Sequence, residues 1–197
     1  MRKWQAVCVG LSLMGAVAYV QAKPLTYDID VPGMHASINF KVNHLGYSWL
    51  LGRFDKFEGY FIEDGQNPAN EKVEVKIDTR SINSNHAERD THLRSDDFLN
   101  AEAHPQARFV STRIANEADG LKRIEGEFTL NGVTKPMVIM ARKVGEGQDP
   151  WGGYRAGFEG STRINMKDYG FKMDLGPASA QVYLDLHIEG VRRDELK

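Results

Sequence analysis

The densest group of side chains able to do chemistry is HAERDTH, from His86 to His92. Imidazole and carboxylate groups together can bind a divalent metal ion. His86 and His92 are six residues apart, however, whereas two ligands on one helical face need a spacing of three or four. The spacing favours a solvated helical turn whose charges pair with one another. We therefore predict no metal site in this segment.

A catalytic interpretation of the chain would use His44, His92, Asp96 or Asp97. Such a pair must converge in one cleft within hydrogen-bond reach. Adjacent carboxylates after a serine are also typical of a helix start, where they meet the favourable end of the dipole. The sequence contains no nucleophile elbow, zinc-protease helix or phosphate-binding loop. We predict no catalytic residues and no cofactor, with an enzyme kept as an alternative.

Large apolar residues in irregular segments are a stronger signal than the polar groups. Leu45, Trp49 and Leu51 lie in one such segment, and Phe98 and Leu99 in another. Two interpretations stay open: these side chains plug one end of the fold, or they form a gate over an apolar cavity. Each buried CH₂ contributes about 0.8 kcal/mol, so a cavity could hold a long chain without a strong polar anchor.

Alternation of apolar and polar residues predicts the strands that position these groups. Ile38, Phe40 and Val42 form one face of the first strand. A second strand carries Phe54 and Phe57, with a bulge expected near Asp55 and Lys56 because the two rings are three residues apart. Further strands are expected over residues 72–78, 107–114, 124–130, 133–144, 154–164 and 181–188.

Two turn signals divide these strands. Asn131-Gly132 predicts a hairpin. Residues 79–105 break the strand pattern, and Asn85 followed by Glu88 predicts a capped short helix from Ala87 to Leu93. Eight antiparallel strands close into a barrel that either packs full or holds one small ligand. A two-sheet sandwich gives a similar pattern, and the pattern alone leaves the two close to even.

The first residues have the composition of a secretory signal peptide. Arg2 and Lys3 precede an uncharged apolar run, residues 6–20, and Ala22 is a small residue at the expected cleavage position. We predict that residues 1–22 are a cleaved signal peptide and that residues 23–197 form one domain. The only cysteine, Cys8, leaves with the signal peptide. Export of a chain without disulfides indicates a bacterial periplasm.

The charge and the remaining hydropathy exclude two classes of partner. The formal net charge is −2, and it becomes more negative when Arg2 and Lys3 are removed. No basic excess is available to neutralise nucleic-acid phosphates. No later segment is long and apolar enough to span a membrane, so we expect no stable membrane insertion. Exposed strand edges and an apolar mouth are compatible with a homodimer.

Several segments, in this order and spacing, resemble the YceI-like family of polyisoprenoid-binding periplasmic proteins. They are HASINFKVNHLGYSWLLGRF (35–54), SINSNHAERDTHLRSDDFLN (81–100), HPQARFVST (104–112), FTLNGVTKP (128–136), DPWGGYRAGFE (149–159) and DLGPAS (174–179). The resemblance covers nearly all of the expected mature chain. One departure is Met166, where many relatives have an arginine.

The resemblance implies an all-β fold: an eight-stranded antiparallel lipocalin-like barrel with a short helical insertion between strands 3 and 4. It also implies a periplasmic carrier of a long-chain isoprenoid or similar lipid, linked to stress in some members, and it brings no catalytic residues. We predict that the lumen is lined by Phe40, Phe54, Phe57, Phe109 and Phe128, with Leu45, Trp49, Leu51, Phe98 and Leu99 at its mouth. The alternatives are an enzyme acting on such a lipid and a ligand-free structural stress protein.

Overall fold

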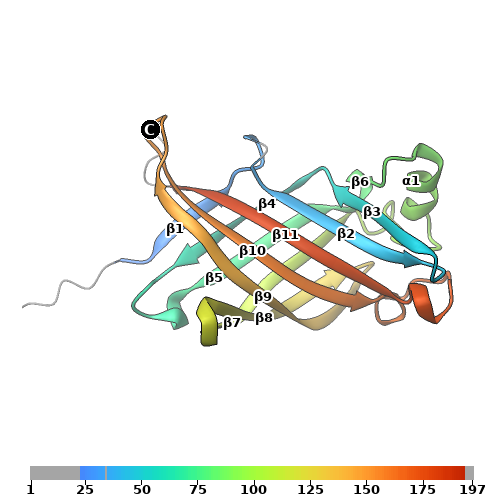
Figure 1. The fold of residues 1–197 in the computed structure, drawn as a ribbon. Helices are drawn as coiled ribbons and strands as arrows, with labels where there is room; N and C mark the ends of the chain where they lie inside the picture. The colour runs from blue at the N-terminus through green and yellow to red at the C-terminus, as the bar shows by residue number, and fades with distance from the viewer. Residues whose placement is uncertain (1–22, 34, 194–197) are drawn as a thin grey trace, which may run out of the picture.

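One antiparallel sheet contains every strand in the part of the chain that the computed structural model describes, residues 23–33 and 35–193 (Figure 1). The predicted signal peptide, residues 1–22, lies outside these residues. The strands are β1 Leu25–Ile29, β2 Ser37–His44, β3 Ser48–Phe54, β4 Phe57–Glu63, β5 Lys72–Asp78, β6 Ile82–Asn83, β7 Gln106–Asn116, β8 Leu121–Leu130, β9 Val133–Gln148, β10 Tyr154–Asn165 and β11 Gln181–Arg192. The helix α1 spans Ala87–Arg94.

The sheet closes because β1 pairs with both β4 and β11. The strands β1 and β2 both pair with β11, so they are two halves of one position in the wall, which we call a stave. The pairs β3/β4 and β5/β6 form two further divided staves, since β4 pairs with β5 and β3 pairs with β6. With β7 to β11 this makes eight antiparallel staves. The predicted eight-stranded barrel is confirmed, and the sandwich is excluded.

Three neighbouring staves are interrupted at the same level of the barrel, and we call this line the seam. Between the first two staves, pairing stops at Asp28 opposite Tyr60 and resumes at Ile38 opposite Phe54. The predicted bulge near Asp55 and Lys56 is instead a break between β3 and β4. The Asp55 and Lys56 N–H groups donate to Ser81, at 3.1 and 3.0 Å. Ser81 thus draws the chain out of the regular ladder.

The helical insertion lies where the sequence predicts it, between the third and fourth staves. Its cap differs: the His86 imidazole Nδ1 accepts the N–H of Arg89 at 3.2 Å, whereas Asn85 has a left-handed φ of 62° one residue earlier. The predicted hairpin at Asn131-Gly132 is confirmed, with positive φ at both residues, as a type I′ turn requires. Two strands, β1 and β6, were not predicted, and Trp49 and Leu51 lie in β3 rather than in the irregular segment expected there.

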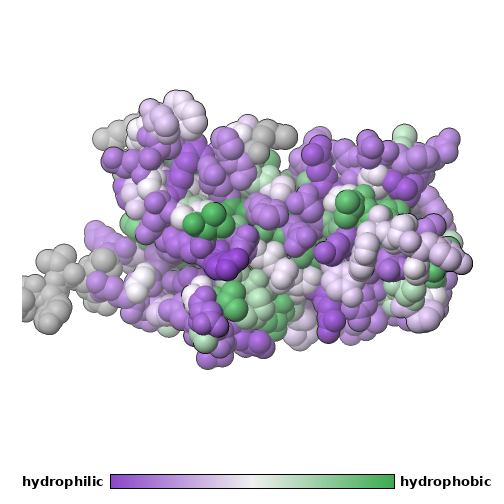
Figure 2. All heavy atoms as spheres, viewed as in Figure 1, coloured by the Kyte–Doolittle hydropathy of each residue, from purple (hydrophilic) through white to green (hydrophobic). Residues whose placement is uncertain are grey.

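The two ends of the barrel differ (Figure 1). The α1 end carries α1 and the β2–β3 and β8–β9 hairpins, and the opposite end carries the β4–β5, β7–β8 and β9–β10 connections. The outer face in Figure 2 is mostly hydrophilic, with scattered apolar patches. No described helix is long and apolar enough to cross a membrane.

Candidate binding site in the barrel lumen

The barrel encloses two adjoining chambers. The larger chamber, about 680 Å³, lies at the α1 end, and the smaller, about 120 Å³, lies toward the opposite end. Four residues line both chambers, and we call them the waist: Ile38, Ile77, Phe128 and Leu184. Because these side chains belong to both linings, the two chambers adjoin at the waist, and we use the word lumen for both together.

Alternation along the strands makes the inner surface apolar. In the smaller chamber, inward residues of β5, β8, β9 and β11 supply much of the apolar lining, among them Val73, Val75, Ile124, Ile139, Leu186 and Ile188. Apolar side chains of β2, β3 and the segment after α1 line much of the larger chamber. The lumen therefore suits an elongated apolar ligand.

Six of the ten predicted site residues line the lumen and are mostly or fully buried. Phe40, Phe54, Phe98 and Leu99 line the larger chamber, Phe109 lines the smaller one, and Phe128 belongs to the waist. The structure thus brings together aromatic side chains from four distant parts of the sequence. Contact of these residues with a ligand stays a prediction.

The predicted mouth residues of the β2–β3 hairpin lie at or beyond the rim. Trp49 and Leu51 contribute to the rim of the larger chamber while remaining 51% and 66% exposed. The Trp49 ring packs edge-on against Tyr183, 5.6 Å between centroids. Leu45 is 49% exposed and lines neither chamber, because its positive φ belongs to the hairpin turn, where its N–H donates to Ser179 Oγ.

Phe57 also lines neither chamber. It is partly buried at the seam, where it packs against both clusters of core side chains. The break at Asp55 and Lys56 separates it from the alternation of β3, so its side chain does not continue the row that ends with Phe54. Contrary to the prediction, Phe57 therefore lies at the seam and does not line the lumen.

The charged residues of the lumen lining were not predicted: Glu63, Glu71, Lys122 and Glu159 at the smaller chamber and Arg89 at the larger. At the smaller chamber, Lys122 Nζ lies 2.8 and 2.7 Å from the two carboxylate oxygens of Glu71, and the Glu71 side chain is only 3% exposed. In the larger chamber, Arg89 of α1 is half-buried. Glu71 and Lys122 are 51 residues apart in the sequence, so their pairing can be recognised only in the folded structure. The sequence predicts a solvated turn around Arg89, whereas the structure places Arg89 in the lining of the larger chamber.

The candidate catalytic residues converge only in part. His92 Nε2 lies 3.0 Å from Asp97 Oδ2, but both side chains are about half exposed. Asp96 instead pairs with Lys172 at 2.6 Å on the surface. His44 lies across the larger chamber at the end of β2. The pair His92–Asp97 borders the rim, and among the described residues neither side chain hydrogen-bonds to a hydroxyl or thiol group.

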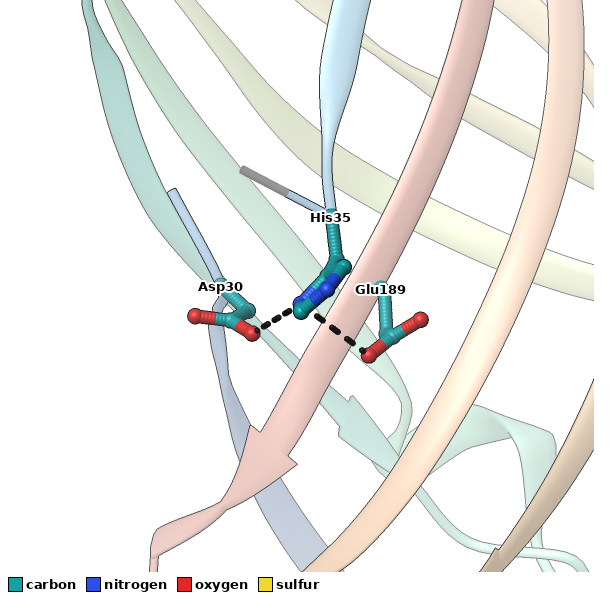
Figure 3. Close-up of side chains that lie close together, drawn as sticks. All are labelled: Asp30, His35 and Glu189. Atoms are coloured by element: carbon teal, nitrogen blue, oxygen red, sulfur yellow. Dashed lines mark hydrogen bonds and ion pairs between the residues drawn. The ribbon is translucent and has the colours of Figure 1, made fainter. Parts of the chain in front are cut away.

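A charged cluster joins the first stave to β10 and β11 at the seam. His35 Nδ1 lies 2.9 Å from Asp30 and 3.8 Å from Glu189, as Figure 3 shows. Their ligand-type atoms all lie within 4.8 Å of one another. Arg155 already supplies a cation to this cluster, since it pairs with Asp30, Glu189 and Asp149 at 2.5, 2.7 and 2.6 Å. We call these five residues the latch.

The latch predicts how stability depends on pH. Burial alone would raise the pKa of Asp30, but hydrogen bonds from His35 and Arg155 outweigh it and lower the pKa to about 2. A carboxyl with a lowered folded-state pKa stabilises the fold above its unfolded pKa and loses that contribution as the pH falls toward the folded value. We expect about 1 kcal/mol, allowing for solvent screening, to be lost between about pH 5 and pH 2.

Urea denaturation across this pH range measures the effect. In Asp30→Asn, the free energy of unfolding should fall less steeply below pH 5 than in the wild type, because the titrating group is gone. Asp174→Asn is the control, since its carboxyl is exposed at the surface. An acid slope in Asp30→Asn equal to that of the wild type would show that Asp30 is not the source.

Comparison with known proteins identifies the family to which the barrel belongs. The YceI-like domain matches residues 27–190, from β1 almost to the end of β11. The chain belongs to the YceI-like family. This YceI-like protein is 58% identical over 188 residues to a UPF0312 protein of Shewanella sp. (strain ANA-3), covering 95% of this chain and 97% of the relative. A UPF0312 protein of Shewanella denitrificans is 60% identical over 167 residues, covering 85% and 87%.

Solved structures share the barrel of this YceI-like protein. BcnA of Burkholderia cenocepacia aligns with a TM-score of 0.70 and 19% identity, over 82% of this chain and 98% of that one. The YCEI protein of Campylobacter jejuni aligns at 0.68 and 25% identity, over 77% and 90%. A polyisoprenoid binding domain from Saccharophagus degradans aligns at 0.63 and 17% identity, over 85% and 99%. The first and third show the fold alone.

Proposed function

We propose that this protein is a periplasmic carrier that encloses one long-chain isoprenoid or similar amphipathic lipid. The observation that carries the proposal is the lumen, whose two chambers meet at the waist and whose walls are mostly apolar. A barrel of this size either fills its interior with side chains or holds one ligand. The volume of the larger chamber alone lies in the range of small-molecule sites.

Energetics supports a long apolar ligand. Each CH₂ moved from water into the lumen contributes about 0.8 kcal/mol, so about ten such groups offset the cost of immobilising the ligand. A short polar ligand would find few partners in the smaller chamber, because its lining is mostly aliphatic and aromatic and its charged pair Glu71–Lys122 is already satisfied. The name of the Saccharophagus degradans domain points to the same class of ligand.

The arrangement of the polar groups supports binding rather than catalysis. The His92–Asp97 pair is half exposed at the rim. A substrate held in the lumen would put most of its chain in apolar surroundings, and the charged residues of the smaller chamber, Glu63, Glu71, Lys122 and Glu159, are already ion-paired. The periplasmic location rests on the signal-peptide pattern of residues 1–22, and a role in stress and a homodimer remain expectations from the sequence.

Native mass spectrometry of the full chain purified from the periplasm tests the proposal. We expect a mass above that of the polypeptide, and solvent extraction should release a lipid of matching mass. Protein stripped of lipid should take up added geranylgeraniol in a one-to-one complex. A homogeneous ligand-free mass together with no uptake of the prenyl alcohol would contradict the carrier and favour a filled structural barrel.

A further inference from the structure

Among the described lumen residues, one cation has no carboxylate partner. The smaller chamber contains Lys122, but Glu71 neutralises it. The larger chamber is lined by one lysine or arginine, Arg89, and by no aspartate or glutamate. Nor does any carboxylate in the described part of the chain lie within ion-pairing distance of Arg89. The carboxylate of Asp90 reaches Arg89 only through the Ser84 hydroxyl, so the half-buried cation has no direct carboxylate contact, and an anionic ligand would offset the remaining cost.

The position of the Arg89 guanidinium is set by neutral groups. Its Nε donates to Ser84 Oγ at 2.7 Å, and its Nη2 donates to the Ser84 carbonyl at 2.5 Å. Ser84 is held in turn by the buried carboxylate of Asp90, which accepts hydrogen bonds from the Ser84 N–H and hydroxyl. Within residues 23–33 and 35–193, Nη1 of Arg89 has no hydrogen-bond partner. The side chain is therefore oriented while one nitrogen remains free.

The rest of the larger chamber shows where an anion would lie. Asn85 and His92 flank Arg89 on the α1 side, and His44 and Ser48 face the chamber from the β2–β3 hairpin. These neutral donors and acceptors are gathered near the mouth, whereas the smaller chamber is mainly apolar. The lumen thus has a polar end with one unpaired cation and an apolar end.

We propose that Arg89 is the head-group site of the lumen and that the ligand is a lipid with an oxyanion head, a phosphate or a carboxylate. This inference rests on the proposed carrier function and adds the class and direction of its ligand. The head lies in the larger chamber against Arg89, and the chain passes the waist into the smaller chamber. Ser84 occupies Nε and one N–H of Nη2, so an oxyanion of either kind would bond Nη1 and the second N–H of Nη2.

Ligands that differ only in the head test the inference. Geranylgeranyl phosphate and geranylgeraniol share one chain, and palmitic acid paired with hexadecanol repeats the comparison for a carboxylate. We expect lipid-stripped wild-type protein to bind each oxyanion about tenfold more tightly than its alcohol, the scale of one charge-assisted hydrogen bond. A preference in only one pair identifies which oxyanion the site takes.

Variants of α1 assign the preference to one side chain. Arg89→Gln should bind the phosphate about as weakly as the alcohol while keeping the affinity for the alcohol. Arg89→Lys should keep part of the preference. Arg94→Gln is the matched control, because Arg94 is on the same helix, has no ion pair among the described residues and lines neither chamber. It should behave like the wild type.

The possible failures are distinguishable. Equal affinity of the wild type for each oxyanion and its alcohol would overturn the head-group site but leave the carrier standing. A preference that persists in Arg89→Gln would also overturn the assignment to Arg89. Absence of binding for all four lipids would contradict the carrier itself. Unchanged affinity of Arg89→Gln for the alcohol shows that the variant is folded.

Discussion

Leu184→Trp should abolish the binding of long chains while leaving short chains bound. Leu184 lies on β11 at the waist, so a larger indole there separates the two chambers. A ligand that can no longer enter the smaller chamber with about four CH₂ groups loses about 3 kcal/mol, which is more than a hundredfold in affinity. Titration with geranylgeraniol and with the shorter geraniol measures the difference.

The control for this variant is Asp185→Trp, which adds the same side chain to the exposed outer face of the same strand. It should bind both alcohols like the wild type. Retained geraniol affinity in Leu184→Trp would show that the barrel is intact, which needs checking because overpacking a core can itself cost about 1–3 kcal/mol. Equal weakening of both ligands, or none, would mean that the ligand does not pass the waist.

Arg155→Met should be among the most destabilising single substitutions. The guanidinium bonds three carboxylates, and the side chains of Asp30 and Asp149 are only 11% and 7% exposed. Removing one partner of a buried charge cluster typically costs about 3–5 kcal/mol, because the other charges stay buried without compensation. For a chain of this size that corresponds to a fall in melting temperature of roughly 10 °C.

Chemical denaturation at pH 7 tests this value, with Arg142→Met as the control. Arg142 pairs with Glu159 on the barrel surface, where both side chains are largely exposed, so its removal should cost less than about 1 kcal/mol. The deficit of Arg155→Met should shrink toward pH 3, because protonation of Asp30 and Asp149 removes the unpaired charges. A loss no larger than that of the control would show that the latch is not a major source of stability.

The fold could be predicted because its local signals agree. Alternation in β11 places Val182, Leu184, Leu186 and Ile188 on one face, and the Asn131-Gly132 turn fixes a hairpin. Alternation is a short-range property, so it survives without knowledge of the partner strand. The same reasoning identified Phe40, Phe109 and Phe128 as inward residues.

The rest depended on contacts between distant segments. The break at Asp55 and Lys56 arises from bonds to Ser81, and it removed Phe57 from the predicted lining. The latch joins Asp30 to Arg155, which are 125 residues apart. No local pattern marks such pairs, since a lysine or glutamate in a strand is compatible with either solvent or a buried partner.

The seam makes the stiffness of the barrel wall differ between its two sides. Five staves, β7 to β11, are single continuous strands, whereas the other three are interrupted at one level. A sheet is least stiff where its ladder hydrogen bonds are missing. The barrel wall should therefore bend more easily along the seam than on the side formed by the continuous strands. The latch lies at one end of the seam. Its ion pairs connect the segment between the two halves of the first stave to β10 and β11.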